Sequence, residues 1–88
     1  MKRRQDFLLR RVGGQDFLVP IGAKVMEMNS LITLNATGRR VWELLAEDYS
    51  MDFLVAEVVE QFDVDIDTAS ADVQAFLDDL GRLGLLET

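Results

Sequence analysis

The sequence predicts an α+β fold in which a small N-terminal three-stranded antiparallel sheet is followed by three helices. Two observations carry this prediction. Up to Asn35 the chain consists of short apolar runs separated by turn-forming residues, which is typical of strands. After Asn35 the apolar residues recur every three or four positions, the spacing of one helical face. With 88 residues, 49% of them hydrophobic, we expect a single domain spanning 1–88.

The first two strands are predicted to form a β-hairpin. Two apolar runs, residues 7–12 and 15–21, are joined by Gly13-Gly14. Glycine reaches the positive φ angles that a two-residue hairpin turn requires, so these glycines predict the turn. Pro20 lacks a backbone N–H and therefore marks a strand end or an edge position.

A looser connection is expected between the hairpin and the third strand. It covers residues 22–30, where Val25, Met26 and Met28 are apolar enough to form a short extra strand. The third strand is predicted at residues 31–34, which read Leu-Ile-Thr-Leu.

The first two helices are predicted from their caps and apolar faces. Asn35 or Thr37 can cap the first helix, which is expected to end near residues 46–49. Ser50 is expected to cap the second, with Asp52 in its first turn. The aromatic residues on the helical apolar faces are expected in the core: Trp42, Phe53, Phe62 and Phe76.

The third helix is the longest. Asp67 is expected to cap it, and Gly84 stands where a left-handed C-terminal cap belongs. Leu85 and Leu86 can then fold back onto the core. Its apolar stripe contains Ala69, Val73, Phe76, Leu77, Leu80 and Leu83.

Composition excludes several kinds of chemistry. The chain has no cysteine and no histidine, so disulfides, thiolate metal sites and histidine proton transfer are absent. We therefore expect no catalytic residues, no bound metal and no cofactor. The apolar stretch after the basic start is broken at Arg10 and Arg11, too early for a signal peptide or a membrane span. A cytoplasmic protein that does not bind membranes is the expectation.

Clusters of carboxylates have simpler explanations than catalysis or metal binding. The alternating aspartates at 63, 65 and 67 resemble the start of a calcium loop, but Thr68 and Gln74 stand where that loop needs glycine and glutamate. Asp72, Asp78 and Asp79 lack the second polar group that acid/base catalysis requires. Asp72 adjoins the apolar stripe and is therefore able to contact a ligand's backbone or a basic side chain.

The alternative function is that of a winged-helix transcription regulator, because strands followed by helices resemble winged helix-turn-helix proteins. The formal net charge of −7 argues against nucleic acid, since binding to phosphates depends on cations. The third helix carries several aspartates against one Arg82. Surface solubility or local ion pairing is the expected role of the remaining cluster of cations: Arg10, Arg11, Arg39 and Arg40.

The feature of the predicted fold that suggests a function is an open sheet edge. Three strands cannot close into a barrel, so an edge strand is left with unpaired N–H and C=O groups. An extended peptide can add to such an edge as a further strand. If the third helix packs beside residues 31–34, strand and helix frame a groove whose apolar pockets select side chains of that peptide.

Two motifs carry a resemblance to the PqqD-like family over nearly the whole chain. Residues 31–45 contain Leu34-Asn35, Thr37-Gly38, Trp42 and Leu44-Leu45 at the family's spacing. Residues 72–80, followed by Gly84-Leu85-Leu86, resemble its closing helix.

The resemblance implies a winged-helix-like recognition element for ribosomally made, post-translationally modified peptides (RiPPs). Such an element binds the leader of a precursor peptide and presents it to a maturase, often a radical S-adenosylmethionine (SAM) enzyme. Asn35, Gly38 and Trp42 are expected to set the turn, the helix start and the core. The sequence leaves open the identity of the peptide and whether the chain forms homodimers. By position, the peptide-binding candidates are Leu31, Ile32, Thr33, Leu34, Asp72, Phe76, Asp79 and Leu83.

Overall fold

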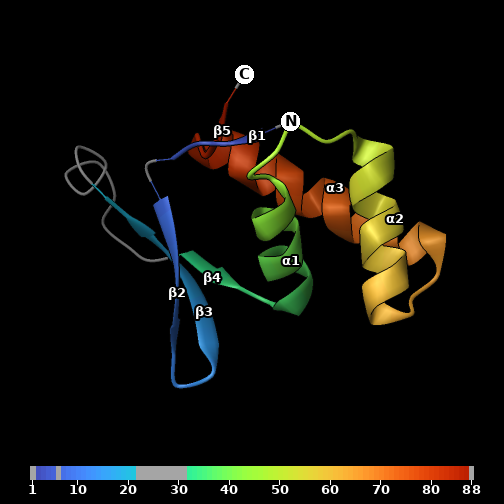
Figure 1. Cartoon of the computed structure of the whole chain (residues 1–88), viewed down its shortest axis with the longest axis horizontal. Helices are drawn as coiled ribbons and strands as arrows, with labels where there is room; N and C mark the ends of the chain where they lie inside the picture. The colour runs from blue at the N-terminus through green and yellow to red at the C-terminus, as the bar shows by residue number, and fades with distance from the viewer. Residues whose placement is uncertain (1, 6, 22–31, 88) are drawn as a thin grey trace.

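The computed structural model describes residues 2–5, 7–21 and 32–87, which form two small antiparallel sheets and three helices (Figure 1). The predicted winged-helix-like α+β fold, a three-stranded antiparallel sheet followed by three helices, is confirmed. None of the described helices is long and apolar enough to cross a membrane. The elements are β1 (Lys2–Arg3), β2 (Phe7–Val12), β3 (Gln15–Pro20), β4 (Ile32–Leu34), α1 (Ala36–Leu44), α2 (Met51–Phe62), α3 (Ile66–Leu83) and β5 (Leu86–Glu87).

The hairpin forms as predicted. Gly13 and Gly14 have φ angles of 59° and 81°, a region that side chains with a Cβ rarely occupy. Val12 lies opposite Gln15 across the turn, and the register continues without a bulge to the pair of Phe7 and Pro20. Pro20 is the last residue of β3, which confirms its assignment to a strand end.

The third predicted strand is β4, which pairs with β3 in antiparallel register. It is described from Ile32, and Leu31 lies outside the described residues. The short strand predicted around Val25, Met26 and Met28 also lies outside them.

A polar side chain caps the N-terminus of each of the three helices. The Asn35 Oδ1 atom accepts a hydrogen bond from the N–H of Gly38 at 2.7 Å, so Asn35 and not Thr37 caps α1. Ser50 caps α2 as predicted, accepting from the N–H of Phe53 at 3.2 Å.

The cap of α3 corrects the sequence prediction. Asp65, not Asp67, caps this helix, and its carboxylate accepts from the N–H of Thr68 at 2.8 Å. Asp63 follows the last residue of α2 in the left-handed conformation, with φ 52°, so only residues 63–65 separate the two helices. Asp67 therefore lies in the first turn, where its negative charge interacts favourably with the helix dipole.

This cap predicts a pH-dependent contribution to stability. Hydrogen bonds from the Thr68 hydroxyl and backbone N–H lower the pKa of the Asp65 carboxyl. A lowered folded-state pKa means that the stabilisation is present above the ordinary pKa and is lost as the pH falls through the folded value. Asp65→Asn keeps a capping oxygen without the charge. We expect its melting temperature to fall less steeply than that of the wild type below pH about 4, and equal slopes in the two thermal melts would contradict this.

The core lies where the three helices meet each other and one face of the sheet. Trp42 at its centre is 1% exposed, while Phe62 and Phe76 are partly buried against it. Phe53 departs from the prediction, because 37% of it is exposed and its ring stacks on Tyr49 with centroids 4.2 Å apart. Fourteen apolar residues of the described part of the chain are buried: Phe7, Leu18, Leu34, Val41, Trp42, Leu45, Leu54, Val55, Val58, Ala69, Val73, Leu77, Leu80 and Leu85.

The sheet of β1 and β5 has no counterpart in the prediction. Lys2 pairs with Glu87 and Arg3 with Leu86, which brings the two ends of the described chain together (Figure 1). Arg3 also donates from its guanidinium to the carbonyl of Trp42 at 2.8 Å and lies 5.2 Å from the centre of its ring. Leu85 before β5 is fully buried, so the predicted return of the chain onto the core is confirmed.

Candidate functional site

Strand β4 has an open edge. The sheet order is β2-β3-β4, so among the described residues β4 pairs with β3 on one side only. The predicted third strand is therefore not enclosed between two described strands. Its second side offers backbone groups to an incoming strand.

The register identifies which backbone groups face outward. Val12 and Gln15 flank a two-residue turn, and such a closing pair exchanges hydrogen bonds. Bonded and non-bonded pairs alternate along an antiparallel ladder, so Phe17 turns its N–H and C=O toward β2. Thr33 lies opposite Phe17 and therefore directs its own N–H and C=O to the open edge. Leu34 faces the other way, and its carbonyl accepts from Gln15 Nε2 at 3.2 Å.

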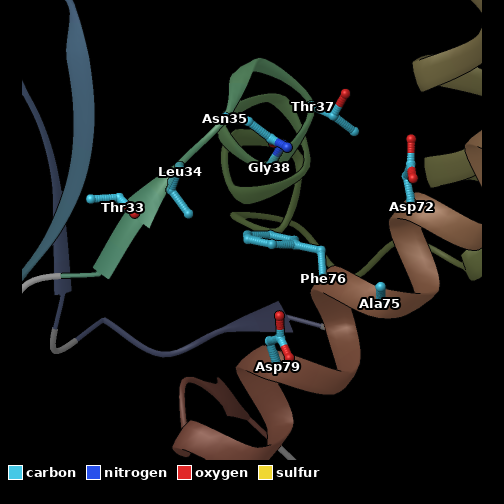
Figure 2. Close-up of a pocket in the computed structure, with 9 residues that line it drawn as sticks. All are labelled: Thr33, Leu34, Asn35, Thr37, Gly38, Asp72, Ala75, Phe76 and Asp79. Carbon is cyan, nitrogen blue, oxygen red and sulfur yellow. The ribbon is translucent and has the colours of Figure 1, made fainter.

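A groove of about 300 Å³ runs between this strand and α3 (Figure 2). The start of α1 closes one end of it. In Figure 2 the side chain of Thr33 points away from Phe76, which agrees with a backbone contribution from this residue. The lining residues are Thr33, Leu34, Asn35, Thr37, Gly38, Asp72, Ala75, Phe76 and Asp79.

Phe76 forms the apolar wall of the groove. Its ring reaches from α3 toward Leu34 and Gly38 (Figure 2). A Cβ at Gly38 would stand 3.2 Å from the Phe76 ring and 3.2 Å from Asn35 Oδ1. Glycine at this position therefore permits both the close approach of α1 to α3 and the cap of α1.

Five of the eight predicted site residues line the groove, namely Thr33, Leu34, Asp72, Phe76 and Asp79. Ile32 and Leu83 are not among the lining residues. Ile32 packs against the core, Leu83 is 47% exposed beyond the groove, and Leu31 lies outside the described residues.

The sequence prediction of the site missed four lining residues: Asn35, Thr37, Gly38 and Ala75. A signal for Ala75 was present, because positions 72, 75, 76 and 79 follow the helical period and so share one face of α3. Asn35 and Gly38 were assigned to the turn and the helix start, and they do both. Their position beside α3 depends on how α1 packs, which a local sequence pattern does not reveal.

The charged residues of the groove are all acidic. Asp72 and Asp79 are its only ionisable lining residues among those described. Arg82 donates a hydrogen bond to Asp79 from outside the groove. The carboxylate of Asp72 makes no hydrogen bond or ion pair with another described residue.

The predicted ion pairing of arginines lies elsewhere, around a buried carboxylate. Asp16 is 6% exposed, and its Oδ1 lies 3.7 Å from Arg11 Nε and 3.9 Å from Arg39 Nη1. Arg39 also approaches Glu43 at 3.7 Å. These contacts tie the hairpin to α1. Among the described residues, no three carboxylates gather closely enough to hold a metal ion.

A comparison with protein families shows to which family the chain belongs. Residues 22–86 match the family described as Coenzyme PQQ synthesis protein D (PqqD). The chain belongs to the PqqD family. The matched span contains β4, the three helices and every residue that lines the groove. No curated protein has a sequence that matches this one.

A solved structure extends the likeness of this PqqD-family chain beyond the matched span. The structure of TbiB1 in complex with the TbiA(beta) leader peptide superimposes with a TM-score of 0.75. The two sequences are 25% identical, and the match covers 99% of this chain and 95% of TbiB1. It therefore includes the β2–β3 hairpin, which the family match leaves out.

Proposed function

We propose that this PqqD-family protein binds the leader segment of a ribosomally made precursor peptide as a strand added to β4. It then presents the peptide to a modifying enzyme, a radical SAM or other RiPP maturase, in the cytoplasm. The whole of 1–88 acts as one peptide-binding domain, without catalysis of its own. The observation that carries the proposal is the outward-facing backbone of Thr33 beside the groove. The TbiB1 complex with a leader peptide supports the same role.

Strand addition sets the orientation of the peptide side chains. The peptide residue opposite Thr33 exchanges hydrogen bonds with it and, like Thr33, points away from the helices. Its two neighbours then point toward the face that carries Leu34 and Phe76 (Figure 2). Backbone hydrogen bonds supply affinity whatever the sequence of the peptide. The groove then selects among peptides by the side chains of these two neighbours.

An NMR titration tests this role. Short peptides are first enriched on the immobilised protein from a displayed library, and the strongest binder is then added to isotope-labelled protein. We expect the amides of residues 32–34 and of the groove face of α3 to shift. Failure to enrich any peptide, or shifts confined to the region around Asp16 and Arg39, would overturn the proposal. Measuring molecular size during the titration separates peptide binding from pairing of two copies through the same edge.

Duplex DNA provides a contrasting ligand. The described part of α3 carries Asp67, Asp72, Asp78 and Asp79 against a single Arg82, and such a surface repels phosphates. We expect no retention of duplex DNA in a filter-binding assay at low salt. Retention would favour the role of a transcription regulator instead.

A further inference from the structure

We infer that the groove selects peptides in which a lysine or arginine stands within two residues of an apolar anchor residue. The inference rests on the proposed function and names the class of peptide that this site takes. Three features of the groove carry it: the sign of its charges, their spacing about Phe76, and an Asp72 carboxylate to which no described residue is paired.

The sign of the charge is uniform inside the groove. Its described lining contains two carboxylates and no cation. A peptide carboxylate placed in the groove would be repelled by the two aspartates. A peptide cation would meet opposite charges at a site that becomes less exposed to water when the peptide covers it, so the attraction strengthens on binding.

The spacing matches an extended peptide. Asp72 and Asp79 are seven residues apart on α3, a rise of about 10 Å, with Phe76 between them. Successive residues of a strand advance about 3.3 Å. An apolar peptide residue against Phe76 therefore has its neighbours on the same face, two residues away, about 7 Å to either side. A long cationic side chain at one of these positions reaches a carboxylate.

The two carboxylates are not equivalent. Arg82 already bonds to Asp79, which shows that a guanidinium fits there but also neutralises part of its charge. Asp72 lies on the same side of the groove as Thr37 (Figure 2), without an ion pair to another described residue. Asp72 is therefore the main determinant of the charge preference.

Asp78 provides a matched control. It lies on the same helix and is exposed like Asp72, but it does not line the groove, and its carboxylate accepts from Gln74 Nε2. Asp72→Asn and Asp78→Asn change the net charge equally. Both positions are on the solvent side of α3, so both variants are expected to keep the wild-type melting temperature.

The test uses three versions of one selected peptide, with lysine, glutamine or glutamate at the position two residues from the apolar anchor. For the wild type we expect the glutamine peptide to bind about fivefold more weakly than the lysine peptide, and the glutamate peptide more weakly still. Raising the salt concentration should narrow the difference. In Asp72→Asn the lysine preference should disappear, while in Asp78→Asn it should remain.

The outcomes distinguish this inference from the proposed function. If all three peptides shift the β4 amides with equal affinity, strand addition stands and the charge preference is wrong. Equal losses in Asp72→Asn and Asp78→Asn would mean that only the overall negative charge attracts cationic peptides, which also overturns the inference. If none of the peptides shifts the β4 amides, the proposed function itself fails.

Discussion

Replacing Thr33 by proline is expected to weaken peptide binding strongly while leaving the fold intact. The Thr33 N–H faces the open edge, so its loss breaks no bond within the described sheet. An incoming strand, however, loses a donor and meets the proline ring. Leaving the peptide carbonyl without a partner weakens binding about tenfold to a hundredfold. Isothermal titration with a selected peptide measures the loss, and a thermal melt checks the fold.

Two further variants make this experiment specific. Thr33→Val keeps the backbone N–H and alters only a side chain that points away from Phe76 (Figure 2), so we expect binding close to that of the wild type. Leu34→Pro removes an N–H that faces β3 and a buried side chain, so we expect a clear loss of stability. Wild-type affinity in a folded Thr33→Pro protein would show that the peptide does not use this edge.

Replacing Trp42 by alanine is expected to have the largest effect on stability. Trp42 is almost fully buried at the meeting point of the helices. Truncating a buried tryptophan costs about 3–5 kcal/mol, a large part of the roughly 4–13 kcal/mol available to a domain of this size. We expect the variant to be largely unfolded at moderate temperature, as measured by denaturant titration.

Phe53→Ala is the matched comparison for Trp42→Ala. It also truncates an aromatic residue on a helix, but Phe53 is more than one third exposed and its ring stacks on that of Tyr49. We expect a loss of about 1 kcal/mol. Similar losses in the two variants would contradict the assignment of Trp42 to the centre of the core.

Local signals predicted most of the fold because each has a local physical cause. Gly13-Gly14 adopts positive φ angles, and Ser50 accepts from an N–H three residues on. These interactions depend little on the rest of the molecule. The misplaced cap of α3 has the same origin, because Asp63, Asp65 and Asp67 are all capable caps and the sequence alone does not select among them. The left-handed turn at Asp63 makes that choice.

The features that the sequence did not reveal arise from packing between distant segments. The β1–β5 pair joins two-residue strands that are too short to show a period. The groove could be placed between the third strand and the third helix, but the part played by Gly38 depends on its approach to Phe76. The same holds for Asp16, whose arginine neighbours come from the hairpin and from α1.

The pairing of Lys2 with Glu87 has a consequence for the order of folding. These residues are separated by almost the whole chain, so bringing them together closes the longest loop in the described structure and carries the highest loop-closure entropy. The hairpin and the helix contacts close much shorter loops. We therefore expect the terminal strands to join last, after the hairpin and helices have assembled, and to open first when the protein fluctuates. Since Arg3 covers one side of Trp42, we expect that opening to expose this side of the core to water.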